Sequence, residues 1–479
     1  MTRRGTKRGR GARRRAEPVP REIAWWRSPF LRLVGWTGLA IGIAWIAFHA
    51  WHDPTFVLTS LGEGVLPLAP VYGFFRPEAT PFVPQATSFV LLAVALLVGG
   101  SVLWQWIPST KRGLFLAFVV VFAAAFRLAV HAVGTAALPG AQFLFYPGED
   151  VLFDVSRINS VGAFLRDYTD LQPDLSLHGR TKPPGFALLH YGIQSWVGDN
   201  VQVVGSLLTC AASLIVLPVF YLGKALRGKP EDGRVCAMLA ATAPSLVSFG
   251  AVSLDAIYAV IAATIFLVAL LELRQPDRLL RVGLGLLLFL AMMLSYSTFI
   301  MGFFVASTLI LERFRRPRAC AVHLVQILAG FLLPFVWLYL YHGFDAVACF
   351  TSARELNTAI MRQAVGQPLT GVAVWLYASV GNVLAFLIYL GLPVVGSWFR
   401  LPRQGLTPVA RVFAGGVFLA FGVACFGGMY LMETERVLLF LVPGATVLAV
   451  LSPGFRPAAA VLLVGLQAIA MDLLLFTLW

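Results

Sequence analysis

An acidic segment with a turn signal is the first place in this chain where side chains could do chemistry. Residues Tyr146 to Asp154 read YPGEDVLFD, so Glu149 and Asp150 directly follow a Pro-Gly turn. A helix beginning after this turn places Asp150 and Asp154 four residues apart, on one face. Carboxylates placed in this way can take a proton from a hydroxyl group or bind a divalent ion. The alternative is that they only stabilise the start of a helix through its dipole.

A basic segment lies about thirty residues further on. His178, Arg180 and Lys182 fall within five residues, and Pro183-Pro184 then stiffens the approach to an apolar stretch. Cations gathered in this way favour an anionic partner such as a lipid phosphate. The alternative is simple pairing with the acids of the same segment.

Isolated charges within or beside apolar runs give three more candidates. Arg127 and His131 lie four residues apart inside one run, where an arginine is costly and faces a bundle interior or a watery cavity. Asp255 opens another run and is either a site residue or a helix N-cap. Arg436 opens a later run and is a candidate phosphate ligand.

The elements that position these side chains are membrane helices. The chain has 479 residues, of which 58% are hydrophobic and only 13% charged, with a mean hydropathy of +0.79. Because a soluble domain is about one-quarter charged, this composition excludes a soluble enzyme and a disordered protein. The runs do not alternate apolar and polar residues, which excludes a transmembrane β-barrel.

The apolar runs predict an all-α polytopic membrane protein with thirteen spans, since about 20 helical residues cross a bilayer. A further apolar stretch, 183–197, is short and predicts a helix lying at the membrane interface. The predicted spans are about 33–51, 88–108, 113–133, 202–224, 235–252, 254–273, 279–296, 298–312, 321–341, 371–397, 411–430, 437–452 and 458–478.

The distribution of charge predicts the orientation. The net charge is +14, and 11 of the 37 Lys and Arg residues lie in 1–32. With this tail in the cytoplasm, 28 of the 37 fall on the inner side, as the positive-inside rule requires. We therefore expect a multi-pass protein of the plasma (inner) membrane whose basic tail contacts anionic lipid rather than nucleic acid. Two long segments, 134–201 and 342–370, then lie outside, and the first carries the acidic and basic segments.

Two patterns are set aside. Gly223 to Lys229 fits GxxxxGK, but Pro230 stands where a phosphate-binding loop needs Ser or Thr, and a membrane helix precedes it. The five cysteines are spread singly, which indicates neither a disulfide framework nor a zinc site.

Taken together, these residues resemble the GT-C superfamily of integral-membrane glycosyltransferases, which use polyprenyl-phosphate sugars. Examples are the protein O-mannosyltransferases and the lipid A aminoarabinose transferase. The similar features are a span ending with Arg127, the pair Glu149-Asp150, the run from Lys182 to Gly185, Asp255, and Arg436 before LLFLVP. The family usually reads Asp-Glu for the pair and has His where this chain has Lys182. The resemblance covers about 113–479, so 33–112 forms two additional N-terminal helices.

The resemblance implies a sugar transfer on the outer face of the membrane, to a glycan, lipid or protein acceptor. Asp150 is expected as the base, with Glu149 or Asp154 assisting. Glu149 and Asp150 are also the expected ligands if a divalent cation (Mg or Mn) takes part, and no organic cofactor is expected. The phosphate-binding residues are expected to be Arg180, Lys182 and Arg436, with His178 and Asp255 at the substrate and Arg127 orienting the acid or the phosphate.

Two other functions remain open at this point. A transporter or flippase for an anionic lipid or solute accounts equally well for the intramembrane arginine and the outer cations. A non-catalytic partner in assembly of the cell envelope is the other alternative.

Overall fold

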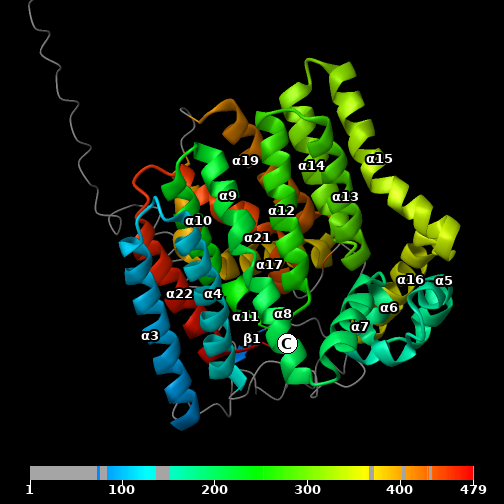
Figure 1. Cartoon of the computed structure of the whole chain (residues 1–479), viewed down its shortest axis with the longest axis horizontal. Coiled ribbons are helices and arrows are strands. Elements are labelled where there is room, and N and C mark those ends of the chain that lie inside the picture. Colours follow the sequence, from blue (N-terminus) through cyan, green and yellow to red (C-terminus); the bar gives the residue numbers. More distant parts are fainter. Residues whose placement is uncertain are drawn as a thin grey trace, which may run out of the picture.

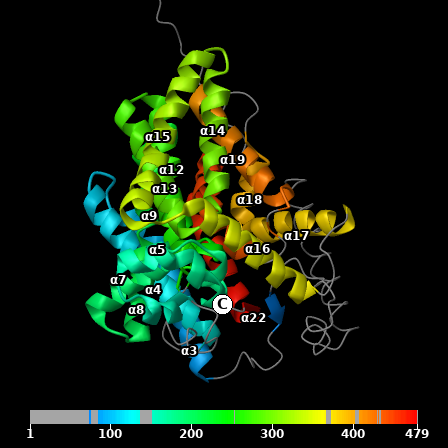
Figure 2. The ribbon, with the colours of Figure 1, turned by 90° about the vertical axis from the view of Figure 1, so that its right-hand side faces the viewer.

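The computed structural model describes residues 73–75, 84–135, 151–251, 253–365, 372–401, 406–428, 430 and 434–477. These residues form a helical bundle with a second, smaller group of helices at one end (Figures 1 and 2). The acidic pair Glu149-Asp150, the basic tail 1–32 and the predicted span 33–51 lie outside the described residues.

The bundle contains the long helices and the short ones that pack among them. Their bounds are α3 (Pro84–Trp106), α4 (Arg112–Thr135), α8 (Val201–Ser213), α9 (Val216–Arg227), α10 (Pro230–Thr242), α11 (Pro244–Ser248), α12 (Asp255–Arg274), α13 (Arg278–Leu294), α14 (Thr298–Arg313), α15 (Pro317–His342), α17 (Val372–Leu390), α18 (Leu392–Trp398), α19 (Pro408–Phe426), α20 (Thr434–Val437), η5 (Leu438–Leu441), α21 (Val442–Val447), η6 (Leu448–Leu451) and α22 (Pro457–Leu474). Two three-residue strands, β1 (Gly73–Phe75) and β2 (Leu475–Thr477), pair in antiparallel fashion.

The smaller group combines the segment that follows the third predicted span with α16, which follows α15. It lies beneath the lower ends of α13 and α15 in Figure 1. It has its own apolar cluster, in which the Phe164 and Tyr168 rings meet edge to face and pack near Phe344. Its elements are the 3₁₀ helices η3 (Val151–Arg157) and η4 (Gln172–Asp174), and α5 (Val161–Leu171), α6 (Leu177–Thr181), α7 (Gly185–Val197) and α16 (Ala346–Val365).

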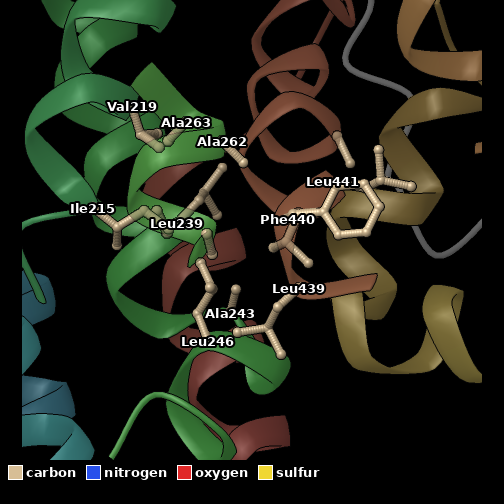
Figure 3. Close-up of a cluster of buried hydrophobic side chains, with 14 of the residues drawn as sticks. Ile215, Val219, Leu239, Ala243, Leu246, Ala262, Ala263, Leu439, Phe440 and Leu441 are labelled. Carbon is tan, nitrogen blue, oxygen red and sulfur yellow. The ribbon is translucent and has the colours of Figure 1, made fainter. Parts of the chain in front are cut away.

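The core of the bundle is built around α10, whose residues from Gly233 to Thr242 are all buried. Many of them are small, so neighbouring helices approach closely, as is typical of membrane helices. Figure 3 shows Leu239 of α10 facing Ile215 and Val219 on one side, with Leu439 and Phe440 of η5 across the cluster. The η5 segment therefore packs inside the bundle rather than beside it.

Six described helices are long and apolar enough to cross a membrane, or seven if one bent pair counts as a single span. The apolar surfaces of these helices indicate a protein embedded in a membrane. Each predicted span from 88–108 onward corresponds to at least one helix of the bundle. The stretch 183–197 is helical as predicted and forms α7.

Four predicted spans consist of more than one helix. The span 202–224 comprises α8 and α9, which together form one continuous apolar stretch. The chain bends by 110° between α17 and α18, where Gly391 has a φ of 104° that other residues rarely adopt. The span 235–252 divides at Ala243-Pro244 into α10 and α11, because proline disfavours a helical conformation of the preceding residue. The span 437–452 consists of short α and 3₁₀ pieces.

Candidate functional site

A carboxylate and two cations from three distant parts of the sequence meet where α12 begins. The Lys182 Nζ atom lies 3.0 Å from Oδ1 of Asp255, and the Nε atom of Arg436 lies 3.6 Å from Oδ2. Asp255 and Arg436 are 7% and 6% exposed, so these charges meet largely away from water. We call Lys182, Asp255, Arg436 and the neighbouring His178 the Asp255 cluster.

Asp255 is held by its own segment. The Ser253 hydroxyl donates to Oδ2 of Asp255 over 3.1 Å, and its oxygen accepts a hydrogen bond from the Asp255 backbone N–H, also over 3.1 Å. Ser253 is a member of the site that the sequence alone did not single out. Its position two residues before a candidate carboxylate was the available signal.

Lys182 is positioned by the turn between α6 and α7. The Tyr168 hydroxyl lies 2.9 Å from the Lys182 carbonyl oxygen and 3.1 Å from that of Gly179, so α5 holds both ends of this turn. The ammonium group also lies 5.0 Å from the centre of the Phe186 ring, a cation–π arrangement. Tyr168 is buried, but nothing in its sequence context indicated this contact.

The start of α7 is fixed by close packing. Pro183 and Pro184 precede it, and Gly185 lies directly against the backbone carbonyl of Met293 at the end of α13. A β-carbon at Gly185 would overlap that carbonyl, so only glycine allows this approach. The Lys-Pro-Pro-Gly run therefore docks the basic segment onto the bundle beside Asp255.

His178 lies near both cations and is held neutral. Burial lowers the pKa of His178 well below its ordinary value of 6.5; the positive charges of Arg436 and Lys182 lower it further, whereas Asp255 opposes them. A neutral imidazole has one ring nitrogen that donates a hydrogen bond and one that accepts. The structure thus brings together four of the predicted site residues.

Asp154 and Arg180 have different surroundings. The carboxylate of Asp154 accepts hydrogen bonds from the backbone N–H of Ser176 at 2.8 Å and from its hydroxyl at 2.7 Å. Ser176 in turn caps α6. Burial raises the pKa of Asp154 above its ordinary value of 3.8, although these two hydrogen bonds act against the shift. The Arg180 Nε donates to the Leu175 carbonyl oxygen over 2.8 Å. Both residues therefore hold the basic segment in shape.

The acidic segment takes a local form that differs from the prediction. Residues Val151–Arg157 form a 3₁₀ helix, not an α-helix, so a spacing of four residues no longer defines one face. Glu149 and Asp150, which directly precede it, lie outside the described residues. Among the described residues, no group of three or more His, Cys, Asp and Glu side chains is placed to hold a metal ion.

Arg127, on α4, is fully buried and is not a member of the Asp255 cluster. Its Nη1 donates to the Ser213 hydroxyl of α8 over 3.3 Å. Nε and Nη2 have no hydrogen-bond partner within the part of the chain that is described. Its side chain packs against Gly250, where a β-carbon would lie 3.0 Å from Nε. His131, one turn further along α4, is also buried.

Comparison with known proteins adds no relative to this picture. No protein-family model, curated protein or solved structure matches the chain. Any functional conclusion therefore depends on the geometry of the site and on the residues that form it.

Proposed function

We propose that this protein is a membrane glycosyltransferase that moves a sugar from a polyprenyl-phosphate donor to an acceptor on the outer face of the membrane. The observation that carries the proposal is the meeting of Lys182, Asp255 and Arg436, which are 73 and 181 positions apart along the chain. Three segments that separately resemble the GT-C pattern thus form one cluster. The thirteen spans, the outer position of 134–201 and the cytoplasmic N-terminus belong to this proposal.

In the proposed reaction, the acceptor oxygen forms a bond to the anomeric carbon as the bond from that carbon to the phosphate oxygen breaks. Asp150 takes the acceptor's proton, with Glu149 beside it. Polyprenyl phosphate leaves with the electrons of the broken bond. Positive groups aimed at the leaving phosphate stabilise the charge that develops there.

Lys182 and Arg436 are the proposed phosphate ligands. Each can donate several hydrogen bonds, and Asp255 accounts for only part of that capacity. Asp255 is then a positioning residue, because it holds cations from the α6–α7 turn and from α20 at one point. Neutral His178 adds a hydrogen-bond donor without a further charge.

A divalent cation, if bound, would be held by Glu149 and Asp150 and would offset the charge of the leaving phosphate. Arg127 and Arg180 do not contact Asp255 through any hydrogen bond or ion pair seen in the described residues. We therefore assign Arg180 to the support of the basic segment, and Arg127 to orienting the acid or the phosphate from within the bundle.

A flippase for an anionic lipid is the second candidate. The 110° break between α17 and α18 favours it, because interrupted helices often line binding sites in transporters. The two functions differ in whether the sugar leaves the lipid.

The proposal is tested by the binding of a labelled polyprenyl-phosphate sugar to the purified protein. The double variant K182Q/R436Q should bind this donor at least about tenfold more weakly, since one hydrogen bond to a charged group contributes about 1.5–3 kcal/mol. The matched control R157Q/R166Q removes two exposed cations from the same segment and should bind as the wild type does. Equal binding by both variants, each eluting as a folded monodisperse protein, would contradict the assignment.

A further inference from the structure

A cavity of about 440 Å³ lies at the end of the bundle opposite the Asp255 cluster. It is formed by the turn before α4, the end of α9 and the start of α10. Arg274, the last residue of α12, donates to the carbonyl of Ala225 beside it. Since α12 begins at Asp255 and rises about 1.5 Å per residue, the cavity and the cluster are separated by about 30 Å.

The lining of this cavity is strongly basic. Lys111, Arg112, Lys224 and Arg234 line it, together with the hydroxyl-bearing residues Ser109 and Thr110 and the rings of two phenylalanines. Among the described residues that line it, none is acidic. Two acids lie in the first turn of α10: Asp232 is 3.6 Å from Arg227, and Glu231 is exposed, although its charge acts on Arg234.

Two helices begin at this cavity. The first turns of α4 and α10 each leave backbone N–H groups without partners inside the helix. At the start of α10, Lys229 provides no side-chain cap. The positive ends of the two helix dipoles thus add to the four cations.

Arg234 gives the independent sign of a ligand. It is only 7% exposed, and its Nη2 donates to the Trp104 carbonyl. Its Nε has no hydrogen-bond partner within the described residues. The guanidinium is packed 4.7 Å from the Phe115 ring centre and 5.6 Å from that of Trp104. A buried guanidinium with an unused donor is costly unless an anion completes its hydrogen bonds.

We propose that this cavity binds a phosphate-bearing anion, with Lys111, Lys224 and Arg234 as its main ligands. Its volume is within the range of small-ligand sites, about 300–1,000 Å³. The GxxxxGK pattern that ends α9 thus contributes Lys224 to a phosphate site without forming a phosphate-binding loop. The phosphate is carried either by the headgroup of an anionic lipid or by a soluble compound.

The experiment measures two probes on the purified full-length protein. One arm follows retention of phosphatidylglycerol, against phosphatidylcholine, by native mass spectrometry. The other follows inorganic pyrophosphate by isothermal titration calorimetry. The wild type should bind at least one probe saturably, and K111Q/K224Q should bind it at least about tenfold more weakly. Selective phosphatidylglycerol retention identifies a headgroup site, and pyrophosphate binding identifies a soluble ligand.

The control R315Q/R318Q removes two exposed cations, one from the turn between α14 and α15 and one from the first turn of α15, and should bind as the wild type does. If the double variant does not fold, the single variant K224Q takes its place. Absence of saturable binding of either probe to the wild type, or equal binding by the pocket variant, would overturn the proposal. Because no residue of the Asp255 cluster is changed, binding of the polyprenyl-phosphate donor should be unaffected, so the two proposals can fail separately.

Discussion

The two ends of α12 each carry one carboxylate, two cations and a histidine, but the two clusters are built differently. At its start, Asp255 meets Lys182 and Arg436 with His178 nearby. Near its other end, about 26 Å away by helical rise, Glu272 meets a second set of two arginines and a histidine. We call these residues the Glu272 cluster; its ion pairs join Oε1 of Glu272 to Arg281 at 3.1 Å, Arg313 at 3.5 Å and His323 at 3.3 Å.

The difference lies in where the partners come from. The partners of Glu272 lie on α13, α14 and α15, the three helices that follow α12 in the chain. The partners of Asp255 come from the α6–α7 turn and from α20. The Glu272 side chain is 1% exposed, whereas that of Lys182 is 19% exposed. One cluster braces neighbouring helices, and the other joins distant segments at an accessible point. A buried charge network alone therefore does not identify a functional site.

The largest effect on stability should follow from neutralising Glu272. In E272Q, Arg281 loses its carboxylate partner, whereas Arg313 keeps a 2.6 Å ion pair with Glu312. Breaking a buried pair, as happens at Arg281, costs about 3–5 kcal/mol. Chemical unfolding in detergent should show this loss of unfolding free energy. D255N should lose less unfolding free energy than E272Q, because Lys182 can reach water. Binding of the polyprenyl-phosphate donor should show the reverse order, with the larger loss in D255N. A D255N protein that is destabilised as much as E272Q, with donor affinity unchanged, would break the distinction between the two ends.

A smaller effect on stability is expected on acidification, from a histidine of α7, the helix that follows Lys182 in the chain. Burial lowers the pKa of His190, on α7, from 6.5 to about 4. Between these values the unfolded chain binds a proton that the folded chain does not, so stability falls as pH falls. Between about pH 7.5 and 5.5 the loss from this group is about 1.4 kcal/mol.

The variant H190Q tests this sign. Its unfolding free energy should fall less than that of the wild type between the same two pH values, whatever the variant's stability at neutral pH. Chemical unfolding followed by far-ultraviolet circular dichroism measures the loss of helix directly, without relying on the fluorescence of the 12 tryptophans. An equal pH dependence in both proteins would exclude His190 as the source.

Much of the bundle follows from local sequence. The apolar runs predict α3, α4, α12, α15 and α19, because burial in lipid depends on composition over about 20 residues. The breaks depend on single residues. Gly391 and Pro244 each interrupt a run that averages as one span, and hydropathy averaged over the run does not reveal the interruption.

The site could be predicted residue by residue but not as an assembly. Lys182, Asp255 and Arg436 were each exceptional in their own segment, yet nothing local states that they meet. Glu272 was not among the predicted site residues, although an acid within LLEL is costly in a membrane. Its partners Arg281 and Arg313 lie near the ends of apolar runs. Their pairing with Glu272 depends on how four helices pack, so local sequence does not predict it.

The proposed transfer of a sugar from a lipid-linked donor is tested most directly by following the label of a polyprenyl-phosphate sugar. Label should leave the lipid in the presence of wild-type protein and acceptor-bearing membranes. D150N should bind donor normally and release label at least about a hundredfold more slowly, as expected for loss of a general base. E149Q is the matched control, and a loss confined to it would move the base to Glu149. If label leaves equally fast with both variants, or crosses the membrane still attached to its lipid, the protein is not the proposed transferase.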